Sequence, residues 1–187
     1  MLSSPHNPLI KELSALHTKK VREATGLFLA EGLQLVGYGV EAGFELVHLM
    51  VKADYEAGQR SADVLATATN AAQNVHEVAP ILMAKLSGKD NPPSIMGVFK
   101  QRLMALKNVK LNANSTWLVL EEPRDPGNVG TCIRSADALG AQGVMMLIPA
   151  TDVWAPECVR ATMGSVFNLP LVRTTRADFL SWLPQGT

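Results

Sequence analysis

One run of residues combines side chains and backbone types that could bind a ligand. It extends from Glu121 to Ala136 and places two prolines, two glycines and two arginines around an asparagine. The run follows the apolar segment 117–120, expected to be a buried parallel strand, and leads into a helix expected over 129–139. Open α/β sheets bind their ligands at this edge, beyond the carboxyl ends of the strands. Because prolines stiffen such a turn and glycines permit a close backbone approach, the run predicts a binding loop.

Asn128 and Arg134 are the candidate functional side chains of this loop. Asn128 is expected to be the N-cap, and Arg134 follows six residues later, turned by roughly 240° about the helix axis. A cation within the first two turns opposes the helix macrodipole, so we expect Arg134 to bind a phosphate or a ribose hydroxyl. An ion pair with Glu121, Glu122 or Asp137 would instead make it a structural residue. The residues alone leave both interpretations open.

Other catalytic and binding signatures are missing from the sequence. There is no GxGxxG dinucleotide loop, no GxxxxGK[ST] phosphate loop and no GxSxG nucleophile elbow. Cys132 and Cys158 stand far apart without a CxxC or HxxxH partner, so we expect two reduced thiols, no disulfide and no metal site. A small molecule that places a phosphate at the helix N-terminus remains an alternative ligand for the loop.

The composition favours a folded protein that touches polyanions locally. Hydrophobic residues make up 47% of the 187 residues, and 17 basic side chains balance 17 acidic ones. No apolar run approaches the roughly 20 residues that cross a bilayer, so we expect a soluble, cytoplasmic protein without a membrane partner. Basic residues gather in two stretches, a pattern that phosphate contacts and a solvated surface explain equally well. The stretches hold Lys11, Lys19, Lys20 and Arg22, and then Lys85, Lys89, Lys100, Arg102, Lys107 and Lys110.

Apolar periodicity divides the chain into two α/β domains, residues 1–100 and residues 116–187, joined by a linker over 101–115. In the first domain short strands and helices alternate. The second domain repeats strand and helix three times, which predicts a parallel doubly wound sheet. The expected strands of the first domain span residues 27–30, 44–51 and 74–78. The expected core of the second domain consists of Leu118, Val119, Leu120, Ile133, Ala136, Leu139, Val144, Met146 and Leu147.

The binding loop resembles the first motif of the SpoU/TrmH RNA ribose methyltransferases. That motif, NxGxxxR in a DPxNxG setting, is matched by Asp125–Gly130 and Ile133–Ala136. The stretch Val159–Pro170 is similar to the next helix and turn of the family, and Ser3–Gly32 is similar to its leading substrate-binding domain. The resemblance covers nearly the whole chain. It implies a small ribosomal-protein-like α/β domain followed by a SPOUT-type domain.

The resemblance also implies methyl transfer from S-adenosylmethionine to a ribose 2′-hydroxyl of RNA, with ribosomal RNA favoured over transfer RNA by the leading domain. Arg134 would contact the phosphate or ribose of the target nucleotide and Asn128 would order the loop, with no metal required. Glu31 would stabilise the fold of the leading domain. The residues expected to contact RNA are Lys11, Lys19, Lys20, Arg22 and Arg124.

The sequence departs from the family pattern in one respect. The family holds its cofactor through two later motifs, one rich in glycine with a glutamate and one with serine and asparagine in a trefoil knot, and neither occurs here. We therefore expect a chain truncated before the knot, with cofactor ligands beyond Thr187 on roughly 60 to 80 further residues. The knotted region would also carry the homodimer contact, which makes a dimer doubtful for this chain. A non-catalytic RNA-binding module of the same ancestry is the alternative.

Overall fold

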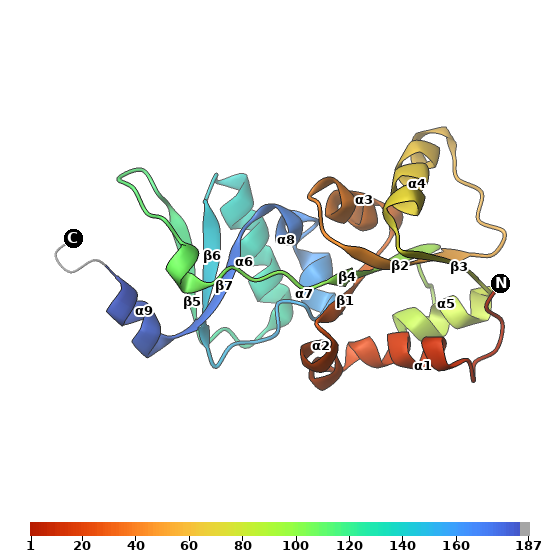
Figure 1. Ribbon diagram of the computed structural model, residues 1–187, viewed down its shortest axis with the longest axis horizontal. Helices are drawn as coiled ribbons and strands as arrows, with labels where there is room; N and C mark the ends of the chain where they lie inside the picture. The colour runs from red at the N-terminus through yellow and green to blue at the C-terminus, as the bar shows by residue number, and fades with distance from the viewer. Residues whose placement is uncertain (184–187) are drawn as a thin grey trace. The chain divides into compact units, whose positions relative to one another are not determined.

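The computed structural model describes residues 1–183, which divide into two units, each with its own sheet (Figure 1). The first unit comprises Met1–Gln101 and Trp154–Pro156, and the second comprises Arg102–Val153 and Glu157–Thr187. The segment 154–156 falls within the predicted second domain, 116–187, but belongs to the first unit. The reason is that the Trp154 indole packs on Phe28, with the ring centroids 4.5 Å apart.

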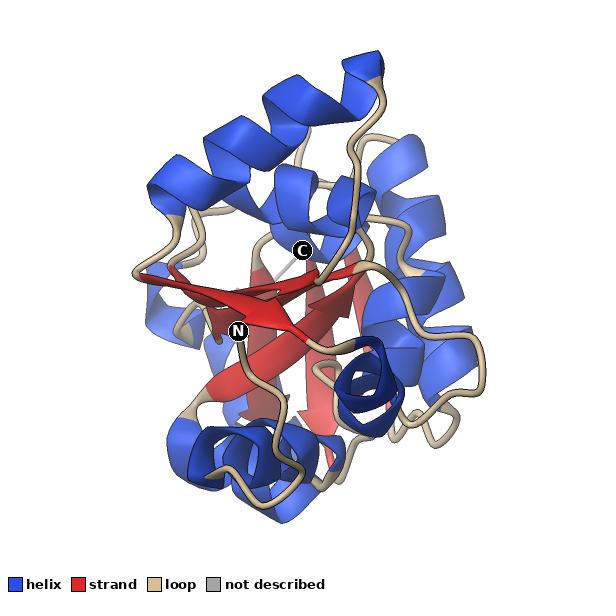
Figure 2. Ribbon diagram, turned by 90° about the vertical axis from the view of Figure 1, so that its right-hand side faces the viewer, coloured by secondary structure: helices blue, strands red, loops and turns tan. Residues whose placement is uncertain are grey.

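A four-stranded sheet with the order β1-β4-β2-β3 forms the first unit. Strand β4 pairs antiparallel with both β1 and β2, whereas β2 and β3 are parallel. Helices cover both faces: α1, α2 and α5 lie on one, and α3 and α4 on the other (Figures 1 and 2). The strands are β1 (Leu27–Glu31), β2 (Leu46–Lys52), β3 (Asn74–Val78) and β4 (Ile95–Lys100). The helices are α1 (Pro8–Ser14), the 3₁₀ helix η1 (Ala15–His17), α2 (Lys19–Thr25), α3 (Leu33–Glu41), α4 (Gln59–Ala71) and α5 (Pro80–Ser87).

Capping residues fix the ends of these short helices. Asn7 caps α1, because its side chain accepts a hydrogen bond from the Leu9 N–H at 2.9 Å. Helices α2 and α5 end at Gly26 and Gly88, which adopt left-handed φ values of 67° and 65° that favour glycine. Over residues 1–183, no helix has the length and apolar content to span a membrane.

Strand β4 is central to the sheet but is missing from the predicted strands. Its run Ile95–Phe99 is buried throughout. A glycine inside a strand weakens strand propensity, which hides the run in the sequence. The fold nevertheless requires Gly97, because a Cβ there would lie 2.7 Å from Phe99 Cε2 and 3.0 Å from Val36 Cγ2. The glycine that obscures the strand therefore allows α3 to pack on it.

The second unit is built on three parallel strands in chain order, which confirms the predicted parallel α/β sheet. Helices cover both of its faces, with α6 on one and α9 and η2 around Met145 and Val172 on the other (Figure 1). The strands are β5 (Trp117–Glu121), β6 (Gly143–Ile148) and β7 (Leu171–Thr175). The helices are η2 (Leu106–Asn108), α6 (Pro126–Ala138), α7 (Pro156–Ala161), α8 (Ser165–Asn168) and α9 (Arg176–Trp182).

Strand β5 is less covered than predicted. It pairs with β6 alone within the described part of the chain, so it lies at the edge of the sheet. Val119 is 37% exposed and Leu139, at the end of α6, is 86% exposed, which corrects their assignment to the core. Leu118 and Leu120 are half-buried. The predicted core residues that are buried are Ile133, Ala136, Val144, Met146 and Leu147.

The segment predicted as a linker, residues 101–115, belongs to the second unit from Arg102 onward and packs within it. The Met104 N–H donates to the Leu171 carbonyl at 2.8 Å, and Met104 forms a parallel bridge with Val172 at the edge of β7. Val109 is buried in the same cluster as Met145. The polar composition of this segment hid these apolar anchors, which contact residues far along the chain.

Helix α7 approaches α6 closely at Gly130. A Cβ at this position would lie 2.6 Å from both the Cys158 carbonyl oxygen and Ala161 Cβ. Such separations are shorter than real Cβ contacts, so only glycine allows the two helices to pack this way. The close neighbour of Gly130 is therefore helix α7 and not a ligand.

Two histidines face each other on neighbouring strands of the first unit. His48 Nδ1 lies 3.1 Å from His76 Nε2, so one ring donates a hydrogen bond to the other. Burial lowers the pKa of His48, against an opposing effect of Glu12, and burial together with His48 lowers the pKa of His76. Both rings are therefore mainly neutral at pH 7.

Acid should destabilise the first unit through this pair. Each histidine has a lower pKa in the folded chain than its unfolded value of about 6.5, so the unfolded chain binds more protons. The stability that the neutral histidine pair contributes is complete above the unfolded pKa of about 6.5 and is lost as the pH falls below it. Urea denaturation should give a smaller loss of unfolding free energy between about pH 7.5 and about pH 5.5 for His76→Gln than for the unmodified chain. His6→Gln is the control at an exposed histidine, and a His76→Gln profile equal to that control would contradict the assignment.

Substitution of Gly130 by alanine should destabilise the second unit. The added methyl group overlaps α7, and overpacking of this kind costs about 1–3 kcal/mol of unfolding free energy. Gly58→Ala is a suitable control, because a Cβ at Gly58 meets no atom within 4 Å and its φ of −63° suits any residue. Urea denaturation compares the two variants, and equal midpoints would show that α7 does not need the glycine.

Candidate active site

Asp125, and not Asn128, caps helix α6. Its Oδ1 accepts a hydrogen bond from the Asn128 N–H at 2.6 Å, and its carbonyl accepts from the Val129 N–H at 3.1 Å. Helix α6 therefore begins at Pro126, three residues earlier than expected. Proline fits the first helical position because the N–H it lacks has no partner there in any helix. The combination of Asp125 and Pro126 was the sequence signal for this start.

Arg134 is exposed on the third turn of α6. This position is too far along the helix for the macrodipole argument, which assumed a later helix start. Two of the acidic residues that could have paired with it are engaged elsewhere: Glu121 lies 3.4 Å from the Arg176 guanidinium, and Asp137 accepts from the Asn168 side chain at 3.2 Å. Within residues 1–183 we find no ion pair or hydrogen bond of the Arg134 side chain. The guanidinium is available to an external ligand.

Asn128 and Arg134 stand on different sides of α6. Both side chains are exposed. Their six-residue separation turns them by roughly 240° and displaces them by about 9 Å along the axis, so they do not converge on one atom within the helix. Asn128 contributes to the loop through its backbone N–H, which the Asp125 carboxylate binds.

A polar hollow of about 270 Å³ opens at the carboxyl ends of β5 and β6. The loops that form it are joined by a hydrogen bond from the Thr151 N–H to the Pro123 carbonyl at 2.9 Å. Arg124, which was predicted to contact RNA, lines this hollow and is exposed. Glu122 also lines it, with a left-handed φ of 45° that is uncommon for a residue with a side chain. The hollow lies at the edge of the sheet where the sequence placed the site.

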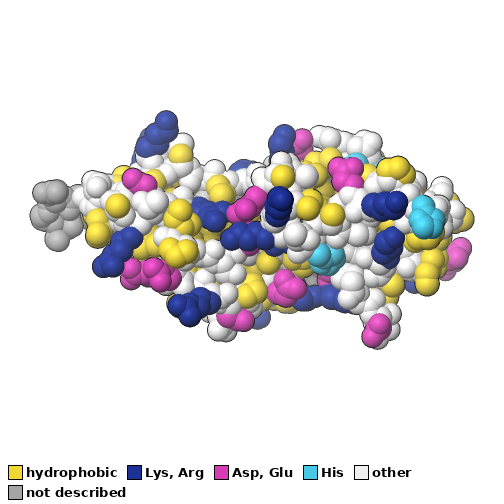
Figure 3. Space-filling view, turned by 90° about the horizontal axis from the view of Figure 1, so that it is seen from below, with side chains coloured by type: hydrophobic (Ala, Val, Ile, Leu, Met, Phe, Trp, Pro, Cys, Tyr) yellow, Lys and Arg dark blue, Asp and Glu magenta, His cyan; other side chains and the backbone are white. Residues whose placement is uncertain are grey.

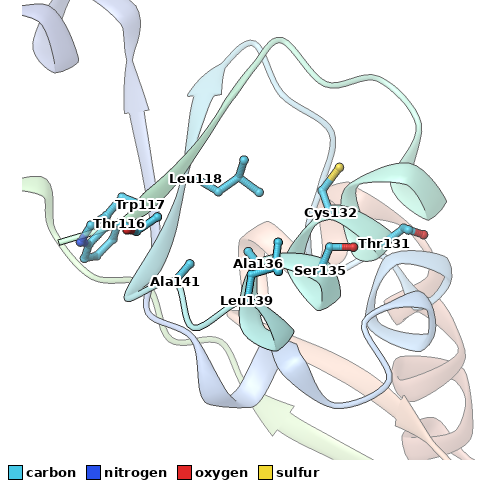
Figure 4. Close-up of a pocket in the computed structure, with 9 residues that line it drawn as sticks. All are labelled: Thr116, Trp117, Leu118, Thr131, Cys132, Ser135, Ala136, Leu139 and Ala141. Carbon is cyan, nitrogen blue, oxygen red and sulfur yellow. The ribbon is translucent and has the colours of Figure 1, made fainter. Parts of the chain in front are cut away.

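A second hollow, of about 330 Å³, lies between β5 and α6 (Figure 4). Its lining is mainly apolar and includes Trp117, Leu118, Cys132 and Leu139. It has few polar groups that could orient a nucleotide, and Arg134 does not line it. We therefore centre the candidate site on the loop 122–134 and not on this apolar hollow.

Neither cysteine offers a reactive group to the site. Burial raises the pKa of the Cys158 thiol to about 12, with smaller contributions from nearby carboxylates, so it remains protonated at neutral pH. Cys132 is half-buried beside the apolar hollow. Among residues 1–183, no group of three or more His, Cys, Asp or Glu side chains could hold a metal ion.

The basic residues of the first unit divide into exposed and buried ones. Lys11, Lys19 and Lys20 are exposed. Arg22 is only 3% exposed, and its Nη1 donates to the Leu16 carbonyl at 2.7 Å, so it belongs to the interior and cannot contact RNA as expected. The Glu31 side chain is 7% exposed and pairs with Lys89, which agrees with its expected role in stabilising the fold.

Two family profiles match the chain, one in each unit. Residues 7–97 match the MRM3-like substrate binding domain, and residues 115–186 match the SpoU rRNA Methylase family. The curated relatives include the 23S rRNA (uridine(2479)-2′-O)-methyltransferase of Streptomyces viridochromogenes, 35% identical over 108 residues, which are 57% of this chain and 38% of the relative. The human mitochondrial rRNA methyltransferase 3 is 31% identical over 101 residues, 51% of this chain and 24% of the relative. The matched part of the chain thus spans well under half the length of these relatives.

Solved structures match over almost the whole chain. The S-adenosylmethionine-bound rRNA methyltransferase of Sinorhizobium meliloti is 36% identical with a TM-score of 0.87, covering 97% of this chain and 67% of that one. A structure described as an RNA 2′-O ribose methyltransferase is 30% identical with a TM-score of 0.80, covering 97% and 68%. The motif loop, the order of the two units and this extended likeness agree, and the chain belongs to the SpoU rRNA methylase family.

Proposed function

We propose that this chain supplies the RNA-binding domain and the first part of the catalytic domain of an S-adenosylmethionine-dependent RNA 2′-O-methyltransferase. The domains would correspond to residues 1–100 and 116–187, with 101–115 between them. The observation that carries the proposal is the exposed Arg134, without an ion-pair partner among residues 1–183, on the helix that follows the motif loop. The names of the relatives support the reaction class.

Neither of the two hollows described within residues 1–183 forms a complete site for S-adenosylmethionine. Pockets that enclose a ligand of this size usually measure about 300–1,000 Å³ and bury most of it. The polar hollow at Glu122 and Arg124 is smaller, at about 270 Å³, and the larger hollow is apolar. We therefore assign no cofactor ligand among the described residues and derive no step through the cofactor.

Arg134 would act on the acceptor nucleotide. A guanidinium stays protonated at any physiological pH, so it cannot serve as a general base. It can instead form paired hydrogen bonds with a phosphate, or stabilise negative charge that develops on the ribose O2′ as the proton of this hydroxyl leaves. Asn128 would order the loop from which α6 starts. Arg124, at the rim of the polar hollow, would contact the RNA backbone.

A second candidate function is RNA binding without catalysis. It is favoured by the incomplete cofactor site among the described residues. Binding of a small molecule through a phosphate at the N-terminus of α6 is disfavoured, because the Asp125 carboxylate already caps that end and would repel an anion. For the methyltransferase function, we also propose ribosomal RNA as the substrate, a cytoplasmic location and a homodimer of the protein that contains this chain.

Loss of the Arg134 side chain should abolish most of the methyl transfer. In a protein that contains this chain and is active, Arg134→Ala should lower kcat/KM by about a hundredfold or more, the usual effect of removing one donor to a developing oxyanion. Arg134→Lys should recover little of this loss, because an ammonium cannot form the paired hydrogen bonds of a guanidinium. Transfer of a labelled methyl group from S-adenosylmethionine to RNA measures the rate.

Lys107→Ala is the control for this experiment, since it removes an exposed cation on η2, the face of the sheet opposite to α6. This control should keep nearly the full rate. Equal rates for Arg134→Ala and Lys107→Ala would remove Arg134 from the reaction.

A further inference from the structure

The helical layer formed by α1, α2 and α5 in the first unit carries exposed lysines. Lys11 lies on α1, Lys19 and Lys20 on α2, and Lys85 on α5. This layer faces the viewer in the right-hand part of Figure 3, where Lys and Arg side chains appear in dark blue. We name these four residues the lysine layer. Lys85 comes from a segment some 65 residues beyond Lys20, so only the fold brings it to the same layer.

The ammonium groups of the lysine layer are weakly engaged. Lys19 lies 4.0 Å from Glu23, with both side chains nearly half exposed, and surface pairs of this kind contribute little free energy. Lys85 Nζ donates to the Pro5 carbonyl, a neutral partner that leaves its charge uncompensated. A phosphate could therefore bind these groups without first breaking a strong ion pair.

The opposite layer of the same unit carries exposed carboxylates. They are Glu41 at the end of α3, Asp63 on α4, and Asp54 and Glu56 in the loop that leads to α4. These charges repel a polyanion. The helices of the lysine layer also carry the exposed Glu12 and Glu23, so four lysines there face two carboxylates. The layer keeps an excess of positive charge, although the chain as a whole is neutral.

The type of cation also differs along the chain. Beyond Lys110 the sequence contains no lysine, and its basic residues are Arg124, Arg134, Arg160, Arg173 and Arg176. Before residue 101 lysine predominates, and one of the two arginines, Arg22, is buried. Lysine acts as a point charge with no preferred plane, whereas arginine binds phosphate with fixed geometry. Lysines therefore suit contacts that tolerate many positions of the RNA.

Exposed aromatic residues, on which unpaired bases could stack, are missing from the lysine layer as described. The one large exposed aromatic side chain found in residues 1–183 is Tyr38, on α3 in the opposite layer. Binding of single strands commonly depends on such stacking, whereas base-paired RNA is bound through its phosphates and its shape.

We propose that the lysine layer binds the phosphate backbone of base-paired RNA, and that the carboxylate-rich α3–α4 layer stays outside the complex. This inference rests on the proposed function, from which it takes RNA as the partner. Beyond that function, it specifies the surface that binds, the base-paired form of the RNA and Lys85 as a contact residue. The contacts depend on charge and not on base identity, so binding should vary steeply with salt and little with sequence.

A comparison of two charge-matched triple variants of the whole chain tests this inference. Lys11→Gln, Lys20→Gln and Lys85→Gln together lower the net charge of the lysine layer by three. Gln59→Glu, Ala66→Glu and Thr69→Glu lower the net charge by the same amount at exposed positions of α4. Fluorescence anisotropy gives the Kd of each protein for an RNA hairpin and for oligouridine of equal length, at about 50 and about 200 mM salt.

The lysine variant should bind the hairpin at least about tenfold more weakly than the α4 variant, and its slope of log Kd against log salt should be smaller by roughly one per lost contact. Urea denaturation is the folding control, and the midpoints of both triple variants should match that of the unmodified chain. Equal weakening by both triple variants, or binding of oligouridine as tight as that of the hairpin, would overturn the inference. If the unmodified chain binds neither RNA, the proposed function itself fails. If the unmodified chain binds the hairpin but both triple variants weaken binding equally, only the inference about the lysine layer fails.

Discussion

The close contact at Gly130 sets the position of the helix that carries the candidate catalytic arginine. Helix α7 can reach α6 only because no Cβ separates Gly130 from the Cys158 carbonyl and Ala161. The Asp125 cap and Pro126 fix where α6 begins, and the start of a helix determines the direction of every later side chain. Arg134 therefore owes its exposed position to backbone constraints at Asp125, Pro126 and Gly130.

In the proposed function the two units would contribute different kinds of RNA recognition. Exposed lysines on the first unit supply charge without strict geometry, and arginines on the second supply hydrogen bonds with fixed directions. A modifying enzyme needs both, since it must hold a large RNA and also align one ribose with the methyl donor. Neutral net charge fits this proposed division, because the carboxylates of the α3–α4 layer would limit binding to unrelated polyanions.

Local patterns predicted the elements around the candidate site better than the helical layers that cover the two sheets. The strand, turn and helix at 117–138 depend on near neighbours, and the sequence located the loop, Arg124 and Arg134 on them. Errors arose where distant residues decide the outcome. Gly97 interrupts the apolar pattern of β4 because α3 packs there through Val36. Arg22 is buried, although the lysines near it in the sequence are exposed. The exposure of Val119 depends on what pairs with β5, which no local pattern encodes.

Direct binding of the RNA acceptor by the Arg134 guanidinium can be observed by NMR. Side-chain Nε–Hε resonances of arginine in a ¹⁵N-labelled sample, assigned through Arg134→Lys, report this contact during titration with an RNA hairpin. The Arg134 resonance should shift and exchange more slowly with solvent as the complex forms, while that of Arg176, already paired with Glu121, should change little. An unchanged Arg134 resonance in a sample saturated with bound RNA would contradict the account.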